Sequence, residues 1–254
     1  KHGSTSLVIT GTTGEAPTLT AIERLRIWET AVDFAGGTVP IIAGVGTNNT
    51  KTTIHNVKLA EEIGVDGVLV VTPYYNKPNQ RGLITHYKEV ARSTDLPILL
   101  YNIPSRTGVS LSLETILELA EVPNIVGIKD SSGDLTLLAE LKKHAPIQFS
   151  LYSGDDSNYL NTLKLGGQGV ISVASHVAGL QMNEIYRLYQ EGKVEEAEVK
   201  KAEDAKEELK KALEGEDIDD IKAMGFKAFS RSVAPCAGEP KGYGGIGIEI
   251  KIGG

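Results

Sequence analysis

The side chain with the clearest chemical potential is a lysine at the end of an apolar run. Lys129 follows Asn124-Ile125-Val126-Gly127-Ile128, a pattern typical of a buried β-strand. A lysine on a covered strand is costly unless it is paired or neutral. Because burial favours the neutral amine, and the neutral amine attacks ketones, this position suits imine chemistry. The alternative is a lysine at the rim of a sheet whose amine extends into solvent.

Hydroxyl and guanidinium groups follow other runs of the same kind. The segment Gly11-Thr12-Thr13-Gly14-Glu15 could turn backbone N–H groups toward a carboxylate, or it could be an ordinary turn between a strand and a helix. It matches neither a Walker loop nor a dinucleotide fingerprint. Tyr75 and Tyr101 could relay protons with Thr12 between them, although buried tyrosines usually just satisfy one hydrogen bond. Arg106 offers a planar fork suited to a carboxylate; the alternative is a loop arginine that binds backbone carbonyls.

Metal chemistry has little support in the sequence. Asp155 and Asp156 share no metal-ligand spacing with a histidine or another carboxylate, so we expect them to cap the helix that follows. The five histidines are scattered and form no metal-binding motif. Cys236 is the single cysteine and has no catalytic signature around it. We therefore expect no metal, and we expect no organic cofactor because the protein amine itself can serve as the electron sink.

Composition argues against several classes of function. The net charge of −7 argues against a nucleic-acid partner, because phosphate binding usually needs a basic face. No apolar stretch reaches the roughly 18 residues that a membrane helix needs, so no membrane partner is expected. The first residues contain no signal-peptide core, and one cysteine fits a reducing compartment. These features predict a cytoplasmic protein.

Short β-prone runs alternate with amphipathic helical segments along most of the chain. This alternation predicts a parallel α/β sheet, and the uniformly apolar runs are typical of strands covered on both faces. Seven such units without a nucleotide fingerprint favour a (β/α)8 TIM barrel, whose active site lies at the carboxyl ends of the strands. The expected strands are Leu7–Thr10, Val39–Gly44, Gly67–Thr72, Pro97–Tyr101, Ile125–Lys129, Phe149–Ser153 and Gly169–Val173. The expected helices include Ala21–Phe34, Thr52–Ile63, Gly82–Ser93, Leu113–Glu121 and Gly192–Glu214.

Taken together, the motifs resemble those of the dihydrodipicolinate synthase family of class I pyruvate aldolases. The resemblance extends over about residues 3–197, with motifs in the same order and at the same separations. It implies a lyase that condenses pyruvate with aspartate semialdehyde to 4-hydroxy-tetrahydrodipicolinate, on the route to lysine through diaminopimelate, without a cofactor. The matching motifs are Gly11-Thr12-Thr13-Gly14-Glu15, Tyr74-Tyr75-Asn76-Lys77-Pro78, Tyr101-Asn102-Ile103-Pro104-Ser105-Arg106-Thr107-Gly108, Gly127-Ile128-Lys129-Asp130, Ser153-Gly154-Asp155-Asp156 and Gly169-Val170-Ile171-Ser172-Val173.

The resemblance implies a catalytic role for four side chains. Lys129 would form the imine, or Schiff base, with pyruvate. Tyr101 and Thr12 would belong to a proton relay. Tyr75 would reach into the site of a neighbouring subunit and complete the relay there, so a homo-oligomer is implied.

Substrate binding is implied for residues around this relay. Backbone N–H groups of Thr12 and Thr13 would hold the pyruvate carboxylate, and the carbonyl of Ile171 would lie against the site. Arg106 would receive the carboxylate of aspartate semialdehyde. One alternative is a sister aldolase acting on a sugar acid, although Arg106 favours the short carboxylated aldehyde. The other is a recombined or engineered barrel whose site is vestigial.

Both ends of the chain depart from the family pattern. A strand and a helix that should precede Gly3 are absent, and so are the family's C-terminal helices beyond about Ala197. Residues 217–254 instead resemble a fragment of the hydroxymethyl-oxoglutarate aldolase, or ribonuclease-activity-regulator-like, family. The likeness rests on Met224-Gly225-Phe226, Phe229-Ser230-Arg231, Ala237-Gly238-Glu239-Pro240-Lys241-Gly242 and Gly247-Ile248-Glu249-Ile250. We interpret the chain as a chimera, natural or engineered.

A single barrel domain over residues 1–254 is nevertheless expected. It would combine an aldolase-like part over 1–197 with a helical extension and a foreign strand over 198–254. The foreign strand, Phe226–Ser232, is predicted to fill the missing first-strand slot, parallel to Leu7–Thr10 and Gly169–Val173. Residues Gly244–Ile252 are then expected outside the eight-strand ring.

Overall fold

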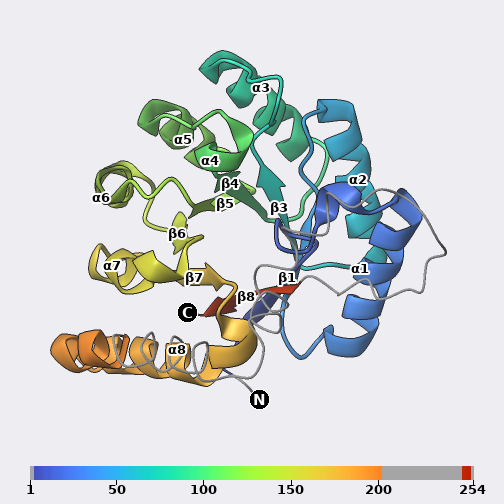
Figure 1. The fold of residues 1–254 in the computed structure, drawn as a ribbon. Coiled ribbons are helices and arrows are strands. Elements are labelled where there is room, and N and C mark those ends of the chain that lie inside the picture. Colours follow the sequence, from blue (N-terminus) through green and yellow to red (C-terminus); the bar gives the residue numbers. More distant parts are fainter. Residues whose placement is uncertain (1–2, 202–247, 253–254) are drawn as a thin grey trace, which may run out of the picture.

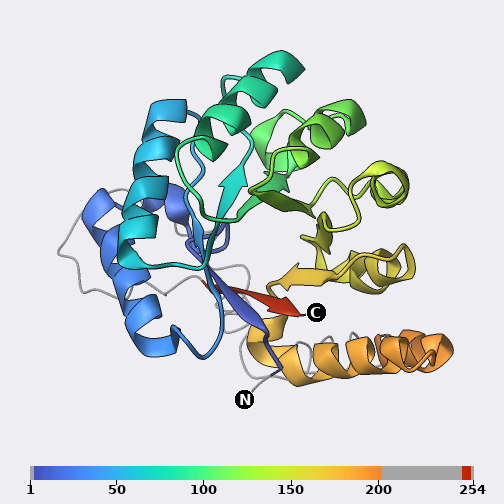
Figure 2. The same cartoon turned by 180° about the vertical axis from the view of Figure 1, so that it is seen from behind.

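The computed structural model of the chain describes residues 3–201 and 248–252. Within these residues eight strands form a closed barrel, and helices surround it (Figures 1 and 2). The predicted α/β barrel is confirmed, and the bounds of its seven predicted strands differ from the observed ones by two residues at most. The strands are β1 (Ser6–Ile9), β2 (Ile41–Gly44), β3 (Gly67–Val71), β4 (Ile98–Asn102), β5 (Ile125–Asp130), β6 (Ser150–Ser153), β7 (Gly169–Ser172) and β8 (Ile248–Ile252).

Helices follow the strands and pack on the outside of the ring. They are α1 (Ala21–Ala35), α2 (Thr50–Ile63), α3 (Gln80–Ala91), α4 (Pro104–Thr107), α5 (Leu113–Ala120), α6 (Leu135–His144), α7 (Tyr159–Lys164) and α8 (Ser175–Gln190), with short 3-10 turns η1 (Ala16–Thr18) and η2 (Asp156–Asn158). Of the predicted helix Gly192–Glu214, residues 194–201 are helical and 202–214 lie outside the described residues. None of the described helices combines the length and apolar character needed to span a lipid bilayer.

Local capping signals fix where the first helices begin. The Thr20 hydroxyl accepts a hydrogen bond from the Glu23 N–H at 3.3 Å, and the Glu23 carboxylate accepts one from the Thr20 N–H at 2.8 Å. This reciprocal pair is a capping box, which stabilises the start of α1. Asn49 caps α2 through the Thr52 N–H at 3.1 Å, and Gly64 ends that helix in the left-handed conformation.

The eighth position of the barrel is filled by a different segment from the one predicted. β8 lies between β1 and β7 and runs antiparallel to both. The prediction that Phe226–Ser232 fills this position in a parallel orientation is therefore wrong, and Phe226–Ser232 itself lies outside the described residues. The placement of Gly244–Ile252 outside the ring is wrong as well, because Ile248–Ile252 is part of it.

A physical reason for this outcome lies in the sequence of β8. The edges of β1 and β7 present main-chain groups that need partners, and an antiparallel strand satisfies them as well as a parallel one. Ile248-Glu249-Ile250-Lys251-Ile252 contains three β-branched residues and no proline, so it has high strand propensity. The prediction of a parallel strand relied on the right-handedness of crossovers between parallel strands. That rule does not apply to an antiparallel strand, so it could not predict β8.

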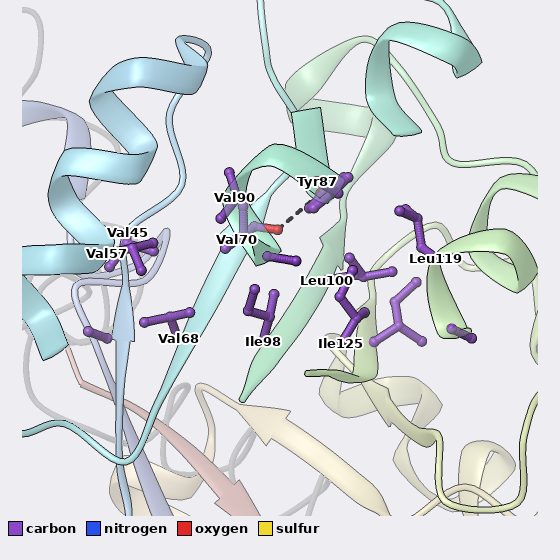
Figure 3. Close-up of a cluster of buried hydrophobic side chains, with 14 of the residues drawn as sticks. Val45, Val57, Val68, Val70, Tyr87, Val90, Ile98, Leu100, Leu119 and Ile125 are labelled. Carbon is purple, nitrogen blue, oxygen red and sulfur yellow. Dashed lines mark hydrogen bonds between the residues drawn. The ribbon is translucent and has the colours of Figure 1, made fainter. Parts of the chain in front are cut away.

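Side chains on the strands divide into an outer and an inner layer. Outward-facing residues such as Val68, Val70 and Ile98 pack against the helices in the cluster of Figure 3. In this layer the buried Tyr87 of α3 donates a hydrogen bond to the Val70 carbonyl at 3.1 Å, and burial raises the pKa of its phenol. Successive residues of a strand point to opposite faces, so the residues between them line the barrel interior.

The inner layer is a smaller buried cluster. It includes Val8, Leu69, Leu99, Tyr101, Ile103, Tyr152 and Ile171. Tyr101 is thus an inward-facing residue near the carboxyl end of β4, the end at which barrels of this class perform chemistry.

Candidate active site

Lys129 and Tyr101 are neighbours on adjacent strands. They are register partners in the parallel pair formed by β4 and β5. Lys129 is only 2% exposed, and its Nζ lies 4.3 Å from the centroid of the Tyr101 ring. The fold therefore holds this amine inside the barrel against the face of a phenol ring.

The turn after β1 brings a threonine to the same tyrosine. The Oγ1 atom of Thr12 lies 3.1 Å from the Tyr101 hydroxyl, and either group can donate the hydrogen bond. Both residues line a cavity of about 460 Å³, together with Thr13 and Arg106. Since this cavity lies beyond the carboxyl ends of the first four strands, it occupies the usual position of a barrel active site.

Three of the predicted site residues do not line this cavity: Lys129, which lies against the Tyr101 ring, Tyr75 and Ile171. Tyr75 is 88% exposed and has a backbone φ of 72°. Its neighbour Tyr74 lines the cavity instead. Ile171, on β7, is fully buried in the inner cluster that also contains Tyr101. A single copy of the chain therefore brings Thr12, Thr13, Tyr101 and Arg106 to one cavity, with Lys129 beside Tyr101.

A buried carboxylate follows Lys129 directly. Asp130 accepts hydrogen bonds from Asn102 Nδ2 at 2.8 Å and from Ser132 Oγ at 2.6 Å. Burial raises the pKa of the Asp130 carboxyl, and these hydrogen bonds oppose the rise. Because Asn102 and Asp130 are register partners one residue beyond Tyr101 and Lys129, their bridge ties the two strand ends together.

Asp155 lies within electrostatic reach of Lys129, the predicted imine-forming residue, and of Arg106, the predicted carboxylate-binding residue. Burial raises the pKa of its carboxyl, whereas the charges of Lys129 and Arg106 lower it. The expected capping of the helix that begins near Tyr159 is not observed, because α7 starts after Asn158 without a side-chain cap and the Asp155 side chain makes no capping hydrogen bond to η2 either. Asp156 instead accepts from the N–H groups of Val173 and Ala174 at 3.2 and 3.0 Å, which joins η2 to the end of β7.

Within residues 3–201 and 248–252, no group of three or more His, Cys, Asp and Glu side chains is arranged to hold a metal ion.

The cavity is also lined by residues outside the sequence motifs. They come from the end of β1, from β2 and the loop after it, from η1 and from α1. The sequence carries no local signal for them, because only the closure of the barrel brings these segments together. They include Thr10, Thr18, Arg24, Gly44, Gly46 and Thr47.

Gly154 is expected to control the position of the Lys129 amine. A Cβ atom at Gly154 would lie 3.0 Å from Lys129 Cε and 1.9 Å from Ser131 Oγ. The serine hydroxyl can rotate away, whereas the confined lysine must shift. We expect Gly154→Ala to slow imine formation on Lys129 by about 10- to 100-fold, measured as the rate of borohydride trapping with a ketone. Gly82→Ala on α3 is the control, and equal effects of the two substitutions would contradict this prediction.

Comparison with known proteins places these motifs in a family. Residues 1–217 match the family model described as the dihydrodipicolinate synthetase family. Over 196 residues the chain is 55% identical to 4-hydroxy-tetrahydrodipicolinate synthase 1 of Halalkalibacterium halodurans, covering 77% of this chain and 66% of the relative. It is 49% identical over 198 residues to the Bacillus subtilis 4-hydroxy-tetrahydrodipicolinate synthase, covering 78% and 68% of the two chains.

Solved structures agree with these matches. A dihydrodipicolinate synthase from Bacillus anthracis superposes with a TM-score of 0.78 and 43% identity, covering 79% of this chain and 69% of that one. The Acinetobacter baumannii dihydrodipicolinate synthase complexed with pyruvate gives a TM-score of 0.81 at 37% identity, covering 93% and 83%.

The matches also bear on the ends of the chain. The chain spans about two thirds of the length of the curated relatives that it matches. The predicted chimera, with residues 217–254 drawn from a second family, has no support in these matches, and the family model itself extends to residue 217. On the motifs, the barrel and the length of the match, the chain belongs to the dihydrodipicolinate synthetase family.

Proposed function

We propose that this protein is a class I aldolase-type lyase that condenses pyruvate with aspartate semialdehyde to 4-hydroxy-tetrahydrodipicolinate. The observation that carries the proposal is the buried Lys129 amine, 4.3 Å from the ring of a tyrosine whose hydroxyl meets Thr12. Relatives at about 50% identity bear the name of this activity.

Pyruvate is the proposed first substrate. The Lys129 amine attacks its keto carbon, water leaves, and an imine forms. Loss of a methyl proton from the imine gives an enamine, the carbon nucleophile of the reaction. Tyr101 and Thr12 would move the protons of these steps, since their hydroxyls are 3.1 Å apart and either can donate. Backbone N–H groups of Thr12 and Thr13 would bind the carboxylate, and the Ile171 carbonyl would border the site. A related synthase has been solved in complex with pyruvate.

Aspartate semialdehyde is the proposed second substrate. The enamine carbon would attack its aldehyde carbon, and the new amino alcohol would close onto the imine carbon and release Lys129. Arg106 lines the cavity, and a guanidinium binds a carboxylate in two parallel hydrogen bonds. The cavity of about 460 Å³ leaves room for both small substrates. The proposed chemistry needs no metal and no organic cofactor, because the protonated imine itself accepts the electrons.

A homo-oligomer is part of the proposal. Tyr75 is 88% exposed in a single copy, and its left-handed backbone is costly for a residue other than glycine. A large aromatic side chain held outward in this way suits a contact with a second copy, where it would complete the proton relay. A cytoplasmic location stays a prediction from the sequence.

One incubation tests the proposal. The protein is treated with pyruvate and borohydride, and intact mass and peptide mapping follow; a parallel assay measures consumption of aspartate semialdehyde. We expect one reduced pyruvate adduct per chain, on the peptide that contains Lys129, together with turnover. An adduct without consumption of the aldehyde, but with cleavage of a sugar acid, would point to the sister aldolase. Absence of any adduct would indicate a vestigial site and would overturn the proposal.

A further inference from the structure

We infer that Thr10 and Trp28 are positioning residues: their hydrogen bond holds Thr10 in a strained backbone conformation and thereby orients the turn Gly11–Thr13 toward Tyr101. The inference rests on the proposed function, and it assigns a role to two residues outside the motifs. The two lie 18 positions apart, one after β1 and one in α1.

The strain is visible in the backbone on either side of the turn. Thr10 has a φ of 57° and Glu15 a φ of 50°, both in the left-handed region. This region is uncommon for residues other than glycine and an outlier for a β-branched residue such as threonine. Such a conformation persists only where the surroundings enforce it, and it is typical of functional sites. Thr10 also lines the cavity, next to the turn that it leads into.

The hydroxyl of Thr10 makes the contacts that enforce this conformation. It accepts a hydrogen bond from Trp28 Nε1 at 2.8 Å, and it lies 2.6 Å from the Ile9 carbonyl and 3.1 Å from the Gly44 carbonyl. Thr10 is 2% exposed and Trp28 is fully buried, so water does not compete effectively for these bonds. Among the described residues, the indole N–H donates a hydrogen bond to the Thr10 hydroxyl and to no other acceptor.

Strand β2 has a glycine, Gly44, where it packs against the backbone of Thr10. A Cβ atom on Gly44 would lie 2.2 Å from the Thr10 carbonyl oxygen and 2.8 Å from its carbonyl carbon. Both of these are backbone atoms, which cannot rotate away. Only glycine at this point of β2 lets the strained residue approach so closely. Helix α1, strand β2 and the end of β1 thus converge on one hydroxyl group.

The bond between Thr10 and Trp28 acts on the site through the next three residues. Any relaxation of Thr10 toward ordinary φ values would rotate the following peptide groups. It would move the N–H groups of Thr12 and Thr13, and it would lengthen the 3.1 Å contact from Thr12 to Tyr101. Pyruvate binding should therefore respond to the hydroxyl at position 10 even though Thr10 performs no chemistry.

Four variants test the inference in the full chain. Thr10→Val keeps the shape and removes the hydroxyl, while Thr10→Ser keeps the hydroxyl. Trp28→Phe removes the indole N–H, and the double variant Thr10→Val/Trp28→Phe removes both partners. Tyr87→Phe is the matched control, because it removes a buried hydrogen bond between a helix and a strand in the outer layer of the barrel, between two residues that do not line the cavity. The readouts are the pyruvate KM, kcat and the melting temperature.

We expect Thr10→Val and Trp28→Phe each to raise the pyruvate KM about tenfold, with a smaller change in kcat. Thr10→Ser should restore a KM near that of the unmodified protein. The double variant should cost no more than either single one, because the two residues act through one bond. Tyr87→Phe should lower the melting temperature and leave KM unchanged.

The outcomes separate this inference from the proposed function. If the unmodified protein forms no pyruvate adduct, the proposed function is wrong, and this inference, which rests on it, is wrong as well. If it reacts normally but Thr10→Val and Trp28→Phe keep its KM, the inference alone is overturned. Additive effects in the double variant, or an equal rise in KM in Tyr87→Phe, would overturn it as well.

Discussion

Lys129→Ala is expected to abolish the pyruvate adduct and to lower the rate of condensation by roughly 10⁴-fold or more. Without the amine no imine forms, so the keto acid has no route to a stabilised carbon nucleophile. The position of this amine is specific, since its 4.3 Å contact with the Tyr101 ring depends on the register of β4 and β5. The measurement combines intact mass after borohydride reduction with steady-state kinetics.

Folding must be separated from chemistry in this experiment. Lys129 is 2% exposed, so its truncation leaves a cavity in the inner layer and could alter stability. Melting curves and circular dichroism establish that the variant is folded at the assay temperature. Lys88→Ala on α3 is the control, because that partly exposed lysine pairs with Glu118 on the outside of the barrel. An undiminished adduct in Lys129→Ala would refute the assignment.

Much of the barrel could be predicted from local patterns. Seven apolar runs and the helices between them carry their own signals, because buried strands are uniformly apolar and helices begin at caps such as Thr20 and Asn49. The contact between Lys129 and Tyr101 also follows from their positions near the ends of two consecutive predicted strands. Residues at the carboxyl ends of adjacent parallel strands are neighbours, and the two-residue period turns both side chains inward.

Closure of the ring could not be predicted in the same way. The sequence contains two β-prone segments after the last helix, and the handedness rule selects between them only if the final strand is parallel. β8 is antiparallel, so the handedness rule, which holds for parallel crossovers, led to the wrong prediction that Phe226–Ser232 closes the ring. The choice depends on which segment can pair with the edges of both β1 and β7, and chain order does not reveal that.

Several contacts around the site also could not be predicted from the sequence motifs. The bond from Trp28 to Thr10 joins a helix to a strand end, and an apolar helical pattern gives no hint of it. The bridge between Asn102 and Asp130 follows from register, since each stands one residue beyond a predicted site residue. The role predicted for Tyr75 depends on a second copy, so a single chain leaves it as a prediction.

The second large effect is expected at Arg106, where Arg106→Ala should lower kcat/KM for aspartate semialdehyde while leaving pyruvate trapping nearly unchanged. A bidentate bond to a carboxylate contributes on the order of 2–4 kcal/mol, which corresponds to roughly 30- to 900-fold in kcat/KM. The loss should be confined to the second substrate, because Arg106 lines the cavity from α4 whereas Lys129 lies on β5.

Charge and geometry at this position can be separated by a second substitution. Arg106 lowers the pKa of the Asp155 carboxyl, so Arg106→Ala removes a carboxylate receptor and also raises the pKa of Asp155. Arg106→Lys keeps the positive charge but loses the planar fork, and it should recover only part of the lost kcat/KM. Arg81→Ala, on the outer helix α3, controls for the removal of a positive charge elsewhere. An unchanged kcat/KM for aspartate semialdehyde in Arg106→Ala would show that the carboxylate of this substrate binds elsewhere. An equally large loss of pyruvate trapping would show that Arg106 acts in the reaction with pyruvate instead.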